Sequence, residues 1–207
     1  YGQAYRQYKT IVYQGSESAT AQLRLAAAAA GEGRVDEALR IERRVATAPG
    51  TPGADDPRAW ARLSSAARMA RLLDERDADA DSDEGTQTAG LADSLRRRLK
   101  ELQLFHAPGT LVVLTWEDLD ADVALVSSRS GREVVVGNPT DGHEVGLAAL
   151  LIPTEELDRV ALEAKLRSLP RSGAMKLVRH DIQWDGSDFE IHIETLELAG
   201  GAAQLTV

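Results

Sequence analysis

The spacing of hydrophobic residues along this chain changes near residue 105. Before that point, apolar residues recur at every third or fourth position among Ala, Arg, Leu and Glu, which is the spacing of one face of an amphipathic helix. After Pro108, Val, Ile, Leu and Thr alternate with polar residues, which is the spacing of half-buried β-strands. The pattern predicts an α+β protein in two parts, a helical domain over residues 1–104 and a β-rich domain over residues 105–207.

Helices are predicted over several stretches of the first part. Ser18 is placed to cap the first of them, and Gly31-Glu32-Gly33 separates it from the second, which gives a helix-turn-helix unit. A third begins after Pro57 with apolar residues along one face, and a fourth carries a stripe of leucines. The predicted helices are Ser18 to Ala30, Val35 to Ala46, the segment after Pro57 with Trp60, Leu63, Ala67 and Ala70, and Ala89 to Leu104.

The segment between the third and fourth helices is strongly acidic. Residues 74–84 read DERDADADSDE, which is too much charge and too little apolar surface to pack, so we expect an exposed loop. Its alternating aspartates could offer oxygen ligands to calcium, but no Gly makes a chelating turn and no Glu closes the loop. We expect its charge to be offset by the cations of the fourth helix, which could instead bind phosphate. These cations are Arg96, Arg97, Arg98 and Lys100.

The second part, residues 105–207, consists of short stretches in which apolar and polar residues alternate, and turns join these stretches. Ser130-Gly131 and Asp185-Gly186 are the predicted tight turns. The predicted strands are Thr110 to Trp116, Asp122 to Ser127, Arg132 to Val136, Leu147 to Ile152, Val160 to Leu166, Met175 to Trp184, Phe189 to Leu198 and Gln204 to Val207. Short strands at this spacing favour a C-terminal antiparallel β-sandwich over residues 105–207.

Residues 154–168 fit two interpretations. Thr154 followed by Glu155 and Glu156 is typical of a helix start, whereas apolar residues alternate from Val160 to Leu166 as in a strand. We predict a short turn and then a strand.

Segments of the helical part repeat at an offset of about 34 residues, which aligns Ala4 with Ala38 and Ile11 with Val45. Residues 1–73 resemble tetratricopeptide repeats in three imperfect units. The matching positions are Ala4, Tyr8 and Ile11, then Leu25, Gly33, Ala38 and Val45, then Trp60, Leu63 and Ala67. The resemblance implies stacked helical hairpins with a protein-binding or spacer role. Glu42 departs from it, because the family prefers a large apolar residue there.

The β-rich part carries the run LVVLTW at Leu111 to Trp116, an acidic turn, and an apolar strand that starts at Asp122 and is followed by Ser130-Gly131. These features are similar to an uncharacterised bacterial β-sandwich domain that follows tetratricopeptide-like segments in some envelope-associated proteins, including ones with von Willebrand factor A domains. Ala124 stands where that family has a second Asp. The resemblance implies a periplasmic or extracytoplasmic location.

Composition narrows the classes of partner. The chain has 24 Lys and Arg against 33 Asp and Glu, a net charge of -9, and no Cys. Nucleic acids and anionic membranes would repel such a protein in the absence of a local basic patch. No apolar run is long enough to span a membrane, and the start at Tyr1 without Met or a signal peptide predicts an excised fragment. We therefore expect another protein as partner, with no nucleic acid and no membrane insertion.

Histidines, serines and glycines do not form any recognisable catalytic or metal-binding motif in this sequence. The histidines His106, His143, His180 and His192 lack the short spacings of a metal site, and we expect His180 and His192 to lie at a surface or core edge. The serines have no G-x-S-x-G context, and the glycine pairs have no following Lys-Ser/Thr, so hydrolase and phosphate-loop chemistry are unsupported. The sequence predicts a protein that is not an enzyme and has no cofactor.

One turn could hold an ion. Its acidic residues Glu117, Asp118, Asp120 and Asp122, joined by Asn138 and Asp141, offer the oxygen ligands that calcium prefers. Acidic residues also occupy sandwich turns for conformational reasons alone. Trp116 and Trp184 are expected to be packing anchors, but would offer a carbohydrate-stacking surface if both pointed outward from one sheet face.

These features favour a non-catalytic protein-interaction or scaffold segment of a larger bacterial protein. We expect the helix Ala89 to Leu104 to dock the tetratricopeptide-like helices onto the sandwich, driven by burial of apolar surface. The alternative is a ligand-binding sandwich, for calcium or carbohydrate, with the helices as a spacer.

Overall fold

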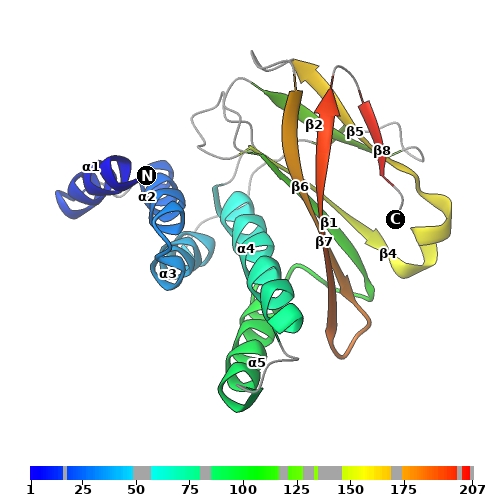
Figure 1. Ribbon diagram of the computed structural model, residues 1–207, viewed down its shortest axis with the longest axis horizontal. Coiled ribbons are helices and arrows are strands. Elements are labelled where there is room, and N and C mark those ends of the chain that lie inside the picture. The colour runs from blue at the N-terminus through cyan, green and yellow to red at the C-terminus, as the bar shows by residue number, and fades with distance from the viewer. Residues whose placement is uncertain are drawn as a thin grey trace.

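The computed structural model describes residues 1–15, 18–48, 57–79, 85–116, 121–127, 133–134, 146–168, 174–199 and 202–205. Within them the helices come first and the strands follow, so the predicted α+β class with N-terminal helices is confirmed (Figure 1). The helices are α1 (Gly2–Tyr13), α2 (Ala19–Gly31), α3 (Val35–Ala46), α4 (Pro57–Asp79) and α5 (Gly85–Glu101). None of the described helices is long and apolar enough to cross a membrane.

The helix boundaries follow local sequence signals. Ser18 caps α2 as predicted, its Oγ accepting a hydrogen bond from the amide of Ala21 at 3.4 Å. Gly33 has a φ of 75°, a left-handed conformation that favours glycine, and it reverses the chain between α2 and α3. Helix α5 begins and ends earlier than predicted, and Gln103 with a φ of 53° follows its end.

The loop predicted over residues 74–84 is wrong in its first part, because α4 continues to Asp79. The helix buries Leu73, whereas the side chain of Glu75 is 54% exposed. Arg71 and Glu75 form an ion pair at 2.9 Å along the helix, a spacing that supports helical structure. Residues 80–84 lie outside the described part of the chain.

The strands form two four-stranded antiparallel sheets. Sheet A has the order β4-β1-β6-β7 and sheet B the order β3-β2-β5-β8. The strands are β1 (Gly109–Trp116), β2 (Asp122–Ser127), β3 (Glu133–Val134), β4 (Gly146–Pro153), β5 (Leu162–Ser168), β6 (Ala174–Trp184), β7 (Phe189–Ala199) and β8 (Ala202–Leu205). Each lies at or within a few residues of its predicted position.

The predicted turn before β5 and the predicted Asp185-Gly186 turn are confirmed, whereas the predicted Ser130-Gly131 turn lies outside the described residues. A 3-10 helix, η2 (Thr154–Arg159), precedes β5, so the ambiguous stretch is a turn and then a strand. Asp185 and Gly186 join β6 to β7, with Gly186 at a φ of 107°. The Asp185 carboxylate accepts hydrogen bonds from the amides of Ser187 at 2.7 Å and Asp188 at 2.9 Å, and these bonds lower its pKa.

Strand β1 is buried along almost its whole length, on both of its faces. Val112, Leu114 and Trp116 pack in a cluster with residues of both sheets. Leu111 and Val113 point the other way, into a cluster that includes residues of α3, α4 and α5. The helical and β-rich parts thus share one of the hydrophobic clusters.

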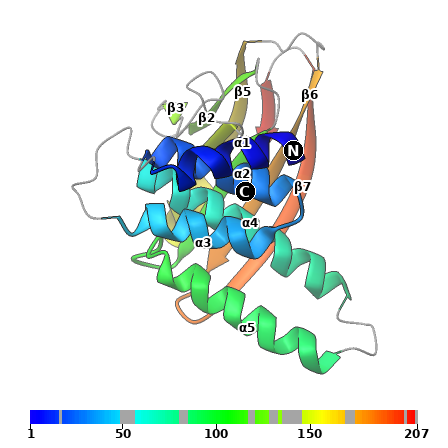
Figure 2. The ribbon, with the colours of Figure 1, turned by 90° about the vertical axis from the view of Figure 1, so that its left-hand side faces the viewer.

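Helix α4, rather than the predicted Ala89–Leu104 helix, makes the main contact with the strands. It contacts β7, β6, β1 and β4, whereas α5 packs mainly against α4 (Figures 1 and 2). The physical reason is that α4 is apolar around more of its circumference, with Trp60, Ala66 and Met69 all buried. A helix of this kind can be covered by a sheet on one side and by other helices on the other.

Candidate functional site

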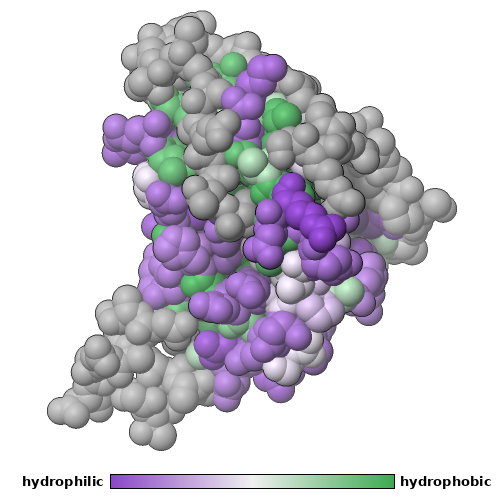
Figure 3. All heavy atoms as spheres, turned by 90° about the vertical axis from the view of Figure 1, so that its right-hand side faces the viewer, coloured by the Kyte–Doolittle hydropathy of each residue, from purple (hydrophilic) through white to green (hydrophobic). Residues whose placement is uncertain are grey.

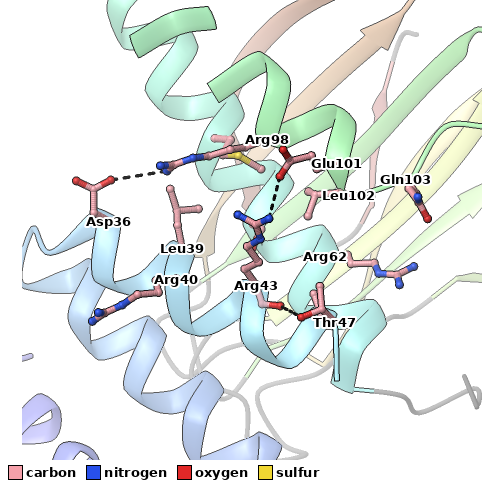
Figure 4. Close-up of a pocket in the computed structure, with 13 residues that line it drawn as sticks. Asp36, Leu39, Arg40, Arg43, Thr47, Arg62, Arg98, Glu101, Leu102 and Gln103 are labelled. Atoms are coloured by element: carbon pink, nitrogen blue, oxygen red, sulfur yellow. Dashed lines mark hydrogen bonds and ion pairs between the residues drawn. The ribbon is translucent and has the colours of Figure 1, made fainter. Parts of the chain in front are cut away.

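A cavity of about 730 Å³ opens between helices α3, α4 and α5, and we call it the arginine groove (Figure 4). Its charged lining consists of four arginines and two acids. These residues are Asp36, Arg40 and Arg43 of α3, Arg62 of α4, and Arg98 and Glu101 of α5. The groove lies on the helical side of the molecule, the side that faces the viewer in Figure 2.

Helical spacing brings these side chains to the groove. Asp36, Arg40 and Arg43 lie three to four residues apart and so share one face of α3. Arg98 and Glu101 have the same relation on α5. The opposite side of α3 is apolar, and its Ala38 and Ile41 pack in a cluster with α1 and α2. Packing of α3 on one face therefore turns its arginines toward α5.

The floor of the groove is apolar. Leu39 and Ala46 come from α3, Met69 from α4, and the half-buried Leu102 follows α5. Met69 and Leu39 also belong to the cluster that joins the helices to sheet A. The lining therefore combines guanidinium groups with an apolar surface.

Two ion pairs bridge α3 and α5 across the groove. Arg43 Nη2 lies 3.3 Å from Glu101 Oε2, and Arg98 Nη1 lies 3.9 Å from Asp36 Oδ1 (Figure 4). The side chains are well exposed, Arg43 at 66% and Asp36 at 95%. Exposed pairs of this kind add little to stability, because water competes for both partners.

The other two arginines add positive charge to the rim. Arg40 lies 4.0 Å from Glu37, at the limit of an ion pair. Among the described residues, no hydrogen bond or ion pair engages the half-buried Arg62 side chain. The groove is thus locally basic, although the chain as a whole has a net charge of -9.

A buried ionic cluster below the groove fixes α3 against α4. The Glu42 carboxylate is 0% exposed and accepts hydrogen bonds from Ser64 Oγ, Ser65 Oγ and Arg68 Nη2, each at 2.9 Å. Ser65 also lines the groove. Sequence reasoning noted Glu42 only as a departure from the repeat pattern. The signal that identifies its role is the run Ser64, Ser65 and Arg68 on the next helix.

The predicted calcium ligands lie mostly outside the described residues. Glu117, Asp118 and Asp120 are not among them, nor are Asn138 and Asp141, and Asp122 is described only as the first residue of β2. The described residues contain no cluster of three or more potential metal ligands. The calcium site therefore stays a prediction.

The two tryptophans are packing anchors, as predicted. Trp116 is 2% exposed in the cluster that contains residues of both sheets, and its Nε1 donates a hydrogen bond to the carbonyl of Ala121 at 3.2 Å. Trp184 is 9% exposed on the opposite face of sheet A, against Phe189 and beneath Lys100. Because both rings are buried on different faces, this pair does not form a carbohydrate-stacking surface.

The histidines do not come together. His180 is buried in β6 and lies 3.2 Å from the hydroxyl of Thr115, while His192 and His106 are exposed and His143 lies outside the described residues. Burial lowers the pKa of His180 to about 4, and the positive charge of Arg71 contributes to this shift. A buried, uncharged imidazole with a hydroxyl partner is a structural group here.

The cations of α5 do not act as one cluster. Arg98 pairs with Asp36, Arg96 lies 3.6 Å from Asp188 in the β6–β7 turn, and Lys100 lies over the ring of Trp184. Residues 80–84 lie outside the described part of the chain, so the expectation that these cations offset the acidic segment stays a prediction. On the strand side of the molecule, the described residues are mostly hydrophilic with scattered hydrophobic ones (Figure 3).

Comparison with protein-family models, curated proteins and solved structures found no match for this chain. The resemblances to tetratricopeptide repeats and to an envelope-associated sandwich therefore stay predictions.

Proposed function

We propose that this chain is a non-catalytic protein-interaction segment of a larger bacterial protein, and that the arginine groove binds an acidic, partly apolar peptide segment of a partner. The observation that carries the proposal is the excess of guanidinium groups over carboxylates above an apolar floor. Guanidinium groups bind carboxylates through paired hydrogen bonds, and they stay charged at every physiological pH.

The size and floor of the groove favour a peptide over a small anion. A volume of about 730 Å³ is in the range of pockets that enclose organic ligands. Leu39 and Met69 are already packed in the shared cluster, but the half-buried Leu102 offers an apolar contact that an inorganic anion would not use. A peptide with two or more carboxylates and an apolar side chain between them would satisfy both parts of the lining.

We also propose a tetratricopeptide-like stacking of the helices and a sandwich arrangement of the two sheets. In support, α1, α2, α3 and α4 pack on one another in chain order, and Ala38 is 0% exposed where a small residue permits close approach. Residues of both sheets meet in one hydrophobic cluster. The proposed periplasmic or extracytoplasmic location is supported by the sequence resemblance alone.

Fluorescence anisotropy tests the proposed binding. The probe is a short fluorescein-labelled peptide rich in Glu and Leu, and the controls are the same peptide with Gln in place of Glu and a labelled single-stranded oligonucleotide. We expect saturable binding of the acidic peptide, weakened by salt, and none of the Gln peptide. Equal binding of the oligonucleotide would contradict a peptide site, and no binding of the acidic peptide would contradict the proposed function.

A further inference from the structure

We propose that Asp36 and Glu101 are internal competitors for the arginines of the groove, so that a partner binds by exchanging its own carboxylates for theirs. This inference rests on the proposed function, because it concerns how the same groove admits an acidic ligand. The inference gives Asp36 and Glu101 a role in setting the affinity and selectivity of the groove. A site that only binds anions would not contain these two acids.

The arrangement of the two ion pairs is reciprocal. Helix α3 supplies the acid of one pair and the arginine of the other, and α5 does the same, so Asp36 meets Arg98 and Arg43 meets Glu101. Asp36 and Arg43 are separated by about two turns of α3. The groove is therefore crossed at two levels, and each crossing places a carboxylate against a guanidinium group (Figure 4).

These two pairs differ from the buried pair of Glu42 and Arg68. Glu42 is 0% exposed, lies 2.9 Å from Arg68 and has two further hydroxyl partners. By contrast, Glu101 is 48% exposed and Asp36 is 95% exposed, and the Asp36 pair is near the limit of an ion pair at 3.9 Å. Exposed, long pairs exchange partners readily, because water solvates each separated group.

The bridged helices are held in place by other contacts. Helices α3 and α5 both pack against α4, and α3 is further fixed by the Glu42 cluster. Leu95 and Leu99 bury the inner face of α5 in the shared cluster. Opening the two pairs therefore frees Arg43 and Arg98 without separating the helices.

The exchange has a consequence for selectivity. A ligand with one carboxylate replaces one internal acid and leaves the other pair closed, whereas a ligand with two carboxylates at suitable spacing replaces both. The internal acids thus lower the affinity for every anion, and only a ligand with two carboxylates can pair with both Arg43 and Arg98 in one binding event. They also repel acidic ligands until they are displaced.

The test compares the acidic peptide's dissociation constant for the wild type with that for Asp36→Asn combined with Glu101→Gln. We expect the double variant to bind about three- to tenfold more tightly, because two exposed competing pairs are removed. The matched control is Asp93→Asn with Glu155→Gln, which changes the net charge equally at two exposed residues that do not line the groove. We expect that control to stay within about twofold of the wild type.

The outcomes separate this inference from the proposed function. Binding that is unchanged or weaker in the Asp36/Glu101 variant, while the wild type binds the acidic peptide, would overturn the competition and leave the function standing. Equal tightening in the control variant would also overturn it, since the effect would then follow net charge. Failure of both proteins to bind the peptide would instead overturn the function. Circular dichroism spectra verify that each variant is folded.

Discussion

The hydroxyl of Ser65 donates a hydrogen bond to Glu42 at 2.9 Å, and the same serine lines the arginine groove. This contact links the buried ionic cluster between α3 and α4 to the surface proposed for binding. A carboxylate with 0% exposure needs every one of its partners, because an unpaired buried charge is strongly unfavourable. The position of the groove wall therefore depends on a residue that does not itself line the groove.

Replacing Glu42 by Ala is expected to destabilise the protein. The change leaves Arg68 and the hydroxyls of Ser64 and Ser65 without their acceptor, and the expected loss in the free energy of unfolding is about 3 kcal/mol. Urea denaturation measures it. Neutralising the exposed Arg71–Glu75 pair by Glu75→Gln is the control, with an expected change below about 0.5 kcal/mol. A similar small change for Glu42→Ala would contradict the structural role of the cluster.

Gly146 is expected to tolerate no side chain. It pairs with Trp116 across β1 and β4, and a Cβ there would overlap the indole ring. Gly146→Ala should lower the free energy of unfolding by about 1–3 kcal/mol, because the buried ring has little room to move. In a Trp116→Phe background the smaller ring leaves space, so the same change should lose less. Equal losses in the two backgrounds would show that the contact is not the cause.

The free energy of unfolding should decrease as the pH is lowered, because the pKa of His180 is lowered in the folded protein. Its pKa is about 4 in the folded protein, against 6.5 as the ordinary value. Between these values the unfolded chain binds a proton that the folded chain excludes, so the contribution is complete above pH 6.5 and is lost as the pH falls toward 4. This residue adds a slope of up to about 1.4 kcal/mol per pH unit.

The measurement is the difference in unfolding free energy between the wild type and His180→Gln across this pH range. Asp181, whose pKa is raised chiefly by burial, contributes with the opposite sign, but it is present in both proteins and cancels to first order. The wild type should lose more stability than the variant as the pH falls. Parallel curves would mean that His180 is hydrated in the folded protein.

Calcium should raise the thermal stability if the acidic turn Glu117, Asp118, Asp120 and Asp122 binds it. At concentrations about 100-fold above the dissociation constant, specific binding adds about 2.7 kcal/mol. Differential scanning calorimetry with added calcium or EDTA measures the shift, and Asp120→Asn with Asp122→Asn should abolish it. An unchanged transition in the presence of calcium would remove the calcium interpretation.

Local signals in the sequence predict the elements well. The capping position of Ser18, the Asp185-Gly186 turn and the alternation in the strands each depend on a few neighbouring residues, and the structure agrees with them. Composition predicts a loop for the acidic residues 74–79, whereas the preceding helical turns and the Arg71–Glu75 pair favour a longer α4.

The site depends on how the helices pack against one another, and the spacing of apolar residues in the sequence does not show this. A helical repeat shows that Arg43 and Arg98 each lie on a polar face, and a polar face is ordinarily taken as solvated. Only the packing of α3 and α5 against α4 turns the two faces toward each other. The same limit applies to Glu42, whose partners come from the following helix.

The most direct test of the arginine groove is a titration of the labelled acidic peptide into two variants of equal net charge. Arg43→Gln with Arg98→Gln removes arginines that line the groove, while Arg44→Gln with Arg97→Gln removes exposed arginines of the same helices that do not line it. The first variant should bind at least about tenfold more weakly than the wild type, since each of these arginines would make charge-assisted hydrogen bonds to the proposed ligand, and the second should bind within about twofold of it. Equal weakening of both variants would contradict a binding site in the groove.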